Sequence, residues 1–208
     1  MDSSSTPDST LWAHLLGGDS NAFATIYDRY FDRLYEYAMR LHPEEDVVKD
    51  VLQELFIKLW TNRDNLSTTV DVRPYLFVSL RGTLYNRLRP RRNVTVVSLD
   101  QDEHDFIAHF SSSSEQNLIN REQDQAQQQK LLQALNQLNP RQKEMIYLRY
   151  FEELDYEQIA DVLNISVKGA YKLSARALKN LRDILGVSTG VLIVMLAAYK
   201  PLLKTCAV

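Results

Sequence analysis

The sequence predicts an all-α protein in which a flexible acidic linker joins two small helical domains. The chain has 208 residues, of which only six are glycine and six are proline, so few positions would interrupt a helix. Hydrophobic residues make up 45% of the chain and charged residues 25%, as in an ordinary globular protein. An acidic, serine-rich segment in the middle leaves roughly 80 residues on each side, which suits two small domains.

The first predicted helix follows Asp19 and Ser20, either of which can cap it. From there to Leu41, apolar and aromatic residues recur at three- and four-residue spacing, which is typical of a helix with one buried face. Phe23 and Tyr27 fall on that face, so we expect both rings in the core.

Two further helices are predicted before the linker. One covers about residues 43–62, with Phe56 and Trp60 turned inward. The other begins with Pro74, which suits the first helical position because it has no backbone N–H to leave unsatisfied, and it stops at Pro90. The outer side of the helix over 43–62 is polar and carries Asp46, Asp50, Gln53 and Glu54.

A purely basic interval lies between Asp71 and Asp100, where the sequence has no acidic residue. Arginines alternate there with aromatic residues. A solvated helix end is the alternative interpretation, but solvated faces usually mix both signs of charge. We therefore favour contact with nucleic acid for this interval, whose arginines are Arg73, Arg81, Arg87, Arg89, Arg91 and Arg92.

Residues 93–121 have the composition of a solvated linker, with five acidic residues, one basic residue and a serine run. His104 and His109 lie near Asp102 and Asp105, and a metal site could be imagined there. A flexible tether is favoured because no rigid element would hold the ligands in place. We expect neither a metal nor a cofactor.

The second half of the chain predicts a helix-turn-helix. Asn139–Pro140 provides a cap and a first helical residue. Asp155 and Gln158 form a capping box for the next helix, which Asn164 would end in the left-handed conformation. Ser166 then caps a longer helix, and in such motifs this second helix enters the major groove of DNA.

The helix that follows Ser166 is cationic on one side. From Ser166 to Arg182 there are five basic residues and no acidic one, although the net charge of the chain is −3. At about 100° per residue, the basic side chains fall in one stripe opposite the apolar residues. Such a stripe neutralises DNA phosphates without reading sequence. Phosphate contacts are expected from Lys172, Arg176, Lys179 and Arg182, and base contacts from Val167, Lys168 and Tyr171 near the start of the helix.

These segments together resemble a known family. The stretch "LNPRQKEMIYLRYFEELDYEQIADVLNISVKGAYKLSARALKNLRDIL" resembles region 4 of bacterial RNA polymerase sigma factors, and "KDVLQELFIKLW" with "PYLFVSLRGTLYNRLR" resembles region 2. The two motifs occur in the order and at the separation found in the extracytoplasmic-function (ECF) group of the sigma-70 family. The resemblance covers roughly residues 10–90 and 122–185.

The resemblance implies a domain organisation. Residues 10–92 would be the region 2 helical bundle, which binds core polymerase and recognises and melts the promoter −10 element. Residues 93–121 would be the linker, and residues 122–185 the region 4 helix-turn-helix that recognises the −35 element. Residues 186–208 would be an apolar C-terminal tail, either packed on region 4 or docking a regulator.

The resemblance also implies roles for particular residues. The helix that docks on the clamp helices of the largest polymerase subunit would contribute Asp50, Gln53, Glu54 and Lys58. The promoter-opening contacts would come from Arg73, Arg81, Arg87 and Arg89, and the −35 contacts from Val167, Lys168, Tyr171, Lys172, Arg176 and Lys179. The chain departs from the family pattern at Gly82, Asn86 and Gly169, where Asn, Asp and Thr respectively are common.

The expected function is that of a sigma factor, which directs core polymerase to specific promoters and is not itself an enzyme. Its partners would be the bacterial polymerase core, promoter DNA and a membrane-bound anti-sigma factor, with no small-molecule substrate. The polar N-terminal stretch "MDSSSTPDSTLW" lacks an apolar leader, so we expect a cytoplasmic protein. The alternative is a one-component helix-turn-helix repressor or activator, which would usually dimerise.

Overall fold

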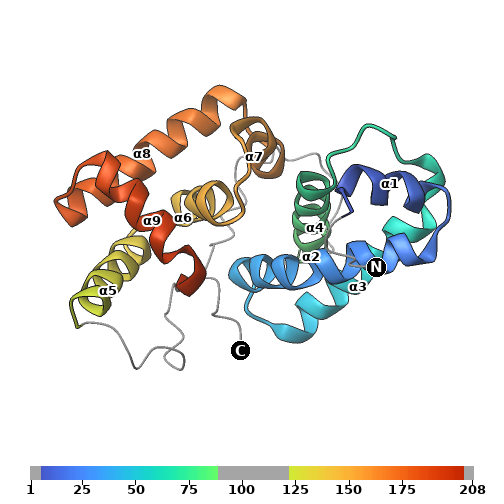
Figure 1. Ribbon diagram of the computed structural model, residues 1–208, viewed down its shortest axis with the longest axis horizontal. Coiled ribbons are helices and arrows are strands. Elements are labelled where there is room, and N and C mark those ends of the chain that lie inside the picture. Colours follow the sequence, from blue (N-terminus) through green and yellow to red (C-terminus); the bar gives the residue numbers. More distant parts are fainter. Residues whose placement is uncertain (1–5, 89–121, 204–208) are drawn as a thin grey trace. The chain divides into compact units, whose positions relative to one another are not determined.

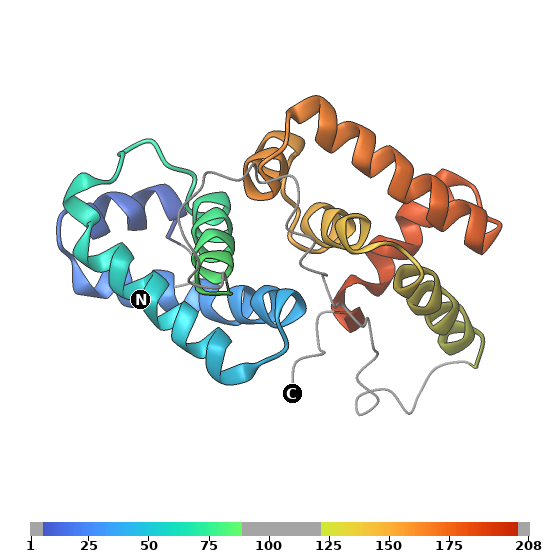
Figure 2. The ribbon, with the colours of Figure 1, turned by 180° about the vertical axis from the view of Figure 1, so that it is seen from behind.

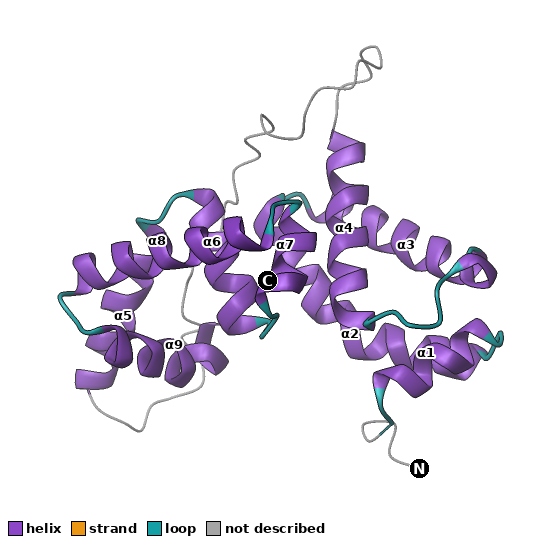
Figure 3. Ribbon diagram, turned by 90° about the horizontal axis from the view of Figure 1, so that it is seen from above, coloured by secondary structure: helices purple, strands orange, loops and turns teal. Residues whose placement is uncertain are grey.

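The computed structural model describes residues 6–88 and 122–203 of the chain. These two ranges form two separate compact units, and the residues described contain helices and loops but no strand (Figures 1 and 3). The prediction of an all-α protein with two small helical domains is therefore confirmed. The predicted linker, with His104 and His109, lies outside the described residues.

The first unit is a helical bundle in which α2 is the longest helix (Figure 1). α2 packs against α1, α3 and α4, and α3 packs against α4. The elements of this unit are α1 (Asp8–Leu16), α2 (Ser20–Leu41), α3 (Glu45–Thr61), the short 3₁₀ helix η1 (Arg63–Asn65) and α4 (Val72–Leu88).

Asp19 caps α2 as predicted, and its Oδ1 accepts hydrogen bonds from the backbone N–H groups of Asn21 and Ala22 at 2.8 and 3.4 Å.

The core of the first unit is built from one face of each helix. The side chains that are almost wholly removed from water include Ile26, Tyr30, Leu34, Tyr37, Val48, Val51, Leu52, Leu76, Phe77, Leu80 and Leu84.

α1, which was not predicted, packs against α2, α4 and η1. Trp12 is fully buried, and its indole N–H donates to the carbonyl of Ser67 at 2.9 Å. Asp8 accepts hydrogen bonds from Arg29 and from the hydroxyl of Tyr30. Burial and then the hydrogen bond to Asp8 raise the pKa of Tyr30, so its phenol stays protonated as a donor.

The boundaries of α3 and α4 differ slightly from the predicted ones. α3 covers residues 45–61 rather than 43–62. α4 begins at Val72, so Pro74 is its third residue and not its first. The helix accommodates it because the first N–H groups of a helix have no internal acceptor, and the N–H of Tyr75 already bonds to the carbonyl of Asp71 at 3.2 Å.

The second unit contains the helix-turn-helix. α8 is its longest helix and packs against α5, α6, α7 and α9; Figure 2 shows α6 running below α8. The elements are α5 (Glu122–Asn136), α6 (Pro140–Ile146), the π-helical turn η2 (Tyr147–Phe151), α7 (Tyr156–Leu163), α8 (Val167–Leu185) and α9 (Thr189–Leu203).

The predicted caps of the second unit are confirmed. Asn139 accepts from the N–H of Gln142 at 2.9 Å, with Pro140 in the first position of α6. Asp155 and Gln158 form the reciprocal capping box of α7, with bonds of 2.8 and 2.9 Å. Each of these contacts joins residues only three positions apart, so local sequence is enough to specify it.

α6 does not end in a regular turn but continues as η2, which was not predicted. Tyr147, Leu148 and Phe151 of this widened turn are buried, and the Tyr147 hydroxyl donates to Glu152 at 3.0 Å. Glu153 then takes a positive φ of 58° before α7 begins. The turn places large aromatic side chains in the core beside α7 and α9.

The apolar tail forms α9, which packs on α8 and η2. Leu192 and Leu196 are fully buried by this packing, whereas Val191, Ile193 and Val194 remain exposed. The first of the two alternatives for the tail, packing on the helix-turn-helix unit, is the one observed.

Replacing Asn164, the left-handed residue at the end of α7 (φ 51°), should destabilise the second unit. Alanine there should be about 1 kcal/mol less stable than glycine, because an alanine Cβ meets the following carbonyl oxygen in this conformation and, unlike asparagine, alanine has no polar side chain to hydrogen-bond locally. Glycine has no such clash and is the matched control. Thermal unfolding should show a melting temperature lower by roughly 4–8 °C for Asn164→Ala than for Asn164→Gly. Equal melting temperatures would contradict the assigned role.

Candidate functional site

Three consecutive residues, Asn164–Ser166, form the turn between α7 and α8. Asn164 leaves α7 in the left-handed region, and the N–H of Ile165 bonds back to the carbonyl of Ala160 at 2.9 Å. Ser166 then accepts from the N–H of Gly169 at 3.1 Å and starts α8. A short helix, a three-residue turn and a longer helix reproduce the arrangement in which the second helix enters a DNA groove.

α8 has two chemically distinct faces. Ala170, Ser174, Ala177 and Leu181 are buried against the unit. Asn180 also donates to the side chain of Gln142 on α6 at 3.1 Å, which ties α8 to α6. The predicted phosphate-binding residues lie together on the exposed side of α8: Lys172, Arg176, Lys179 and Arg182, with Lys168 near its start.

The predicted base-reading residues occupy the first two turns of α8. Val167, Lys168 and Tyr171 are all exposed, and Tyr171 keeps 55% of its surface accessible. The ring of Tyr171 nevertheless has a partner, because its centroid lies 4.0 Å from that of Tyr156 at the start of α7.

The cap that Ser166 provides for α8 explains why a glycine suits position 169. A Cβ at this position would lie 3.2 Å from the hydroxyl oxygen of Ser166, which is tighter than ordinary van der Waals contact. The glycine therefore leaves room for the Ser166 hydroxyl to bond to its N–H. At Gly82, on the exposed side of α4, a Cβ would meet nothing within 4 Å, so space does not explain that glycine.

The predicted promoter-opening arginines of α4 have different surroundings. Arg81 places its guanidinium 4.5 Å from the ring centroid of Tyr85, one turn along the helix. Arg73 is half-buried and interacts with Tyr30, so it also serves the fold. Arg89, Arg91 and Arg92 lie outside the described residues.

Arg87 joins two predicted surfaces. Its guanidinium lies 2.6 Å from the carboxylate of Asp50 and 4.0 Å from that of Glu54, both on α3. The predicted polymerase-binding face and a predicted DNA contact thus share one ion pair. The side chains of Arg87 and Asp50 remain 44% and 57% exposed, so this pair stabilises the fold by no more than about 1 kcal/mol.

The outer face of α3 is polar, as predicted. Gln53 and Lys58 are exposed, and Lys58 pairs with Glu54 at 2.6 Å. None of these side chains fills the core, which comes instead from the opposite face of the helix. The face is therefore available to another molecule.

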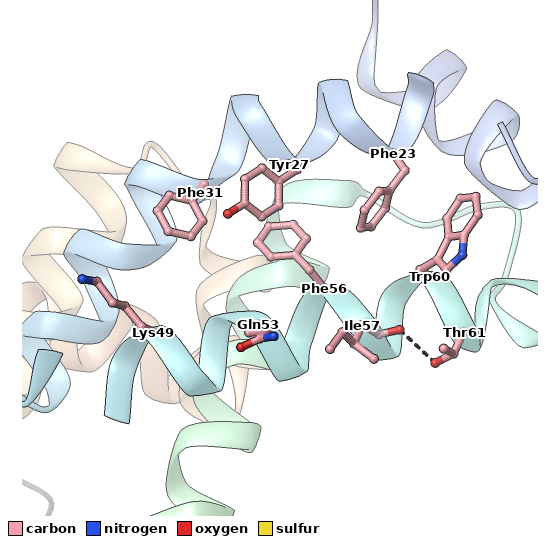
Figure 4. Close-up of a pocket in the computed structure, with 9 residues that line it drawn as sticks. All are labelled: Phe23, Tyr27, Phe31, Lys49, Gln53, Phe56, Ile57, Trp60 and Thr61. Atoms are coloured by element: carbon pink, nitrogen blue, oxygen red, sulfur yellow. Dashed lines mark hydrogen bonds between the residues drawn. The ribbon is translucent and has the colours of Figure 1, made fainter. Parts of the chain in front are cut away.

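An apolar groove between α2 and α3 borders this face, and the sequence did not predict it. The groove has a volume of about 590 Å³ (Figure 4). Phe23 and Tyr27, which we expected in the core, line it, and Tyr27 is 37% exposed. The other lining residues are Phe31, Lys49, Gln53, Phe56, Ile57, Trp60 and Thr61.

The aromatic rings of the groove pack on one another across the two helices. The centroids of Tyr27 and Phe56 are 4.6 Å apart, and those of Phe23 and Trp60 are 5.2 Å apart. Figure 4 shows Gln53 and Ile57 along the α3 side. Ile57 is 53% exposed, which is unusual for an isoleucine. An apolar floor beside a polar rim is typical of a protein-binding surface.

The described part of the chain was compared with two further kinds of site, a cluster of metal ligands and a membrane-spanning helix. Residues 6–88 and 122–203 contain no group of three or more His, Cys, Asp and Glu side chains that could hold a metal ion. No single helix within these ranges is both long and apolar enough to cross a membrane. α8 and the start of α9 meet both conditions only when taken together, and the chain bends by 93° between them.

Two family models match the chain. The model of sigma-70 region 2 matches residues 26–94, and that of sigma-70 region 4 matches residues 128–181, which together span more than half of the sequence. The matched ranges include α3 and α4 in one unit and α6, α7 and most of α8 in the other.

Curated proteins with similar sequences agree with these models. The chain is 26% identical over 177 residues to the ECF RNA polymerase sigma factor SigW of Bacillus subtilis (strain 168), covering 80% of the chain and 92% of the relative. It is 27% identical over 168 residues to the ECF RNA polymerase sigma factor SigL of Mycobacterium tuberculosis (strain ATCC 25618 / H37Rv), covering 78% and 90%.

Two solved structures have a similar fold. One is CnrH in complex with the cytosolic domain of CnrY, with a TM-score of 0.56 and 20% identity over 86% of this chain and 97% of that one. The other is the sigma factor RpoE in complex with the anti-sigma factor NepR from Bartonella quintana, with a TM-score of 0.52 and 22% identity over 80% and 98%.

Gly82 and Gly169 should respond differently to replacement by alanine. Gly82→Ala should stabilise the first unit by about 1 kcal/mol, because alanine favours the helix and its Cβ has open space. Gly169→Ala should stabilise the second unit less, since the new Cβ would press on the Ser166 cap. Urea unfolding of the two variants measures the difference, and a gain at residue 169 equal to that at residue 82 would contradict the role of Gly169 in the cap.

Proposed function

The chain belongs to the sigma-70 family of RNA polymerase sigma factors, and from this premise we propose how its two helical units divide the work of promoter recognition. As a sigma factor of the ECF group, the protein directs core polymerase to specific promoters and initiates transcription. Different surfaces of the two units bind polymerase, duplex DNA and unpaired DNA.

The second unit reads duplex DNA through α8. The observation that carries this assignment is the exposed basic stripe of Lys172, Arg176 and Lys179 on a helix that three caps hold in a helix-turn-helix. Lysine and arginine in this position neutralise phosphates and set the register of the helix in the groove. Val167, Lys168 and Tyr171, at the start of the helix, then face base edges.

The first unit binds core polymerase through α3. Asp50, Gln53, Glu54 and Lys58 form the polar part of this surface, and the groove that Tyr27 and Ile57 line forms its apolar part. Apolar contacts at the centre and polar contacts around them are the usual composition of a specific interface.

α4 holds the unpaired strand of the −10 element. Arg81 and Tyr85 form a cation–π pair on it, and both groups can contact single-stranded DNA, the arginine through phosphates and the ring by stacking. Arg73, Arg87 and Arg89 are assigned to the same surface. Gly82 and Asn86, which depart from the family pattern, lie among these residues and would alter the contacts.

The protein acts in the cytoplasm without a metal, a cofactor or catalysis of its own, and residues 93–121 span the distance between the promoter elements. Residues 10–92 and 122–185 are the two working domains. An anti-sigma factor regulates the protein, by analogy with the complexes in which CnrH and RpoE were solved.

The one-component regulator is the weaker candidate. A repressor or activator could use the same helix-turn-helix, but it has no need of a region 2 unit, and the region 2 model matches residues 26–94. A free repressor would bind duplex promoter DNA by itself, whereas the sigma factor should require core polymerase for specific initiation.

The polymerase-binding surface can be tested with Asp50→Ala combined with Gln53→Ala. This variant should bind purified core polymerase at least tenfold more weakly, a loss of about 1.4 kcal/mol, and its melting temperature should change little because both side chains are exposed. Affinity is measured by titrating labelled protein with core enzyme in the absence of DNA.

The control for that variant is Arg87→Ala, which breaks the same ion pair from the other side. It should bind core polymerase nearly as well as the wild type. If Arg87→Ala weakened binding equally, the ion pair and not the α3 surface would be responsible. Tight, specific binding of the free wild-type protein to duplex promoters would favour the repressor function instead.

The two basic surfaces should fail in different ways. Alanine at Lys172, Arg176 or Lys179 should weaken promoter recruitment on all sequences and lower the slope of log K against log salt by about one per contact. Arg81→Ala should leave the closed complex largely intact and reduce strand opening. Filter binding measures recruitment, and permanganate reactivity of unpaired thymines measures opening. Equal losses in both assays for both classes of variant would refute separate roles.

A further inference from the structure

Tyr171 is a large aromatic side chain that lies outside the core of the second unit. It lies five residues into α8, between Lys168 and Lys172 in sequence, and 55% of its surface is exposed. An exposed tyrosine on a helix would ordinarily change rotamers freely. Here, neighbouring side chains restrain the ring.

Four contacts connect Tyr171 to the backbone of the unit. Its ring packs on the ring of Tyr156 in a tilted arrangement, with centroids 4.0 Å apart and planes 31° from parallel. The Tyr156 hydroxyl is 3.2 Å from the buried hydroxyl of Ser174, and the guanidinium of Arg149 lies 4.8 Å from the centre of the Tyr156 ring. Arg149 in turn donates to the carbonyl of Leu154 at 2.7 Å.

We propose that Tyr171 reads a thymine in the upstream promoter element through the apolar part of its ring, and that Tyr156 and Arg149 are positioning residues that hold the ring for this contact. The proposal rests on the assignment of α8 to duplex DNA. Beyond that assignment, it names the base that Tyr171 contacts and the residues outside α8 that position the Tyr171 ring.

The choice of thymine follows from the chemistry of the groove. In the major groove, thymine alone among the four bases presents an apolar group, its C5 methyl. A phenol hydroxyl both donates and accepts, so it distinguishes poorly between the donor and acceptor patterns of the other bases. An aromatic ring with Tyr156 over one face still offers its edge and other face to a methyl group.

The restraint also explains why two tyrosines are paired. A side chain that is fixed before binding loses less conformational freedom when DNA arrives, and it cannot turn away to accommodate a different base. Lys172, Arg176 and Lys179 of α8 contact phosphates and set the register, so the ring meets the same base step each time.

The experiment compares sequence preferences of holoenzymes assembled from core polymerase and full-length variants. Each holoenzyme selects from a promoter library in which the upstream element is randomised. Because the profile compares DNA sequences within one variant, a partial loss of folded protein lowers all sequences alike and leaves the profile unchanged.

Wild type should prefer thymine at one position by about tenfold. Tyr171→Ala and Tyr156→Ala should both remove the preference at that position. Tyr171→Phe and Tyr156→Phe keep the rings and should retain it. Lys172→Ala is the matched control from the same face of α8, and it should weaken binding across the library while keeping the thymine preference.

A second measurement isolates the methyl group. Uracil in place of thymine at the selected position should weaken wild-type recruitment about fourfold and Tyr171→Ala recruitment hardly at all. The proposal is wrong if Tyr171→Ala keeps the wild-type profile, or if it weakens all sequences evenly, as a phosphate contact would. A wild-type holoenzyme with no promoter preference at all would instead refute the assignment of α8 to DNA.

Discussion

The geometry of the DNA-binding unit depends on how the chain turns from α7 into α8 within three residues. The first four N–H groups of a helix and the last four carbonyls have no partner within the helix, so such a tight turn needs other groups to satisfy them. The Ser166 side chain accepts from the N–H of Gly169 at the start of α8, and the left-handed Asn164 lets the backbone reverse, so that the N–H of Ile165 bonds to the carbonyl of Ala160 at the end of α7. The direction of α8 is therefore set by local hydrogen bonds, and packing of Ala170, Ala177 and Leu181 holds it there.

The helices of the first unit meet two requirements at once, because they bury a core and also present a surface to a partner. α3 does this by dividing its circumference into three parts. One side fills the core, a second carries Asp50, Gln53 and Glu54, and a third, with Phe56 and Trp60, meets the aromatic side chains of α2. Because the rings pack on one another across the groove, apolar surface can stay open without collapsing into the core.

The sequence predicted what short-range chemistry determines and missed what depends on distant partners. The caps at Asn139 and Asp155 and the basic stripe of α8 follow from residues within one or two turns, and the structure contains all of them. The groove could not be predicted, because the three- and four-residue spacing that places Tyr27 near the core does not tell how close α3 approaches. Likewise the contact of Arg87 with Asp50 joins residues 37 positions apart. α1 and α5 were missed since one is short and the other is mostly glutamine and charged residues, with few apolar positions to reveal a period.

The separation of the two faces of α8 bears on how promoter preference can change over evolution. Val167, Lys168 and Lys172 contribute little to the core, and exposed substitutions usually alter stability by less than about 0.5 kcal/mol. Lineages can therefore drift at these positions one mutation at a time without passing through unstable intermediates. Tyr171 is less free, because it is paired with Tyr156 on another helix. Replacing Tyr171 leaves the Tyr156 ring without this contact. Residues 156 and 171 should therefore change together among related proteins, while their neighbours on the same surface diverge independently.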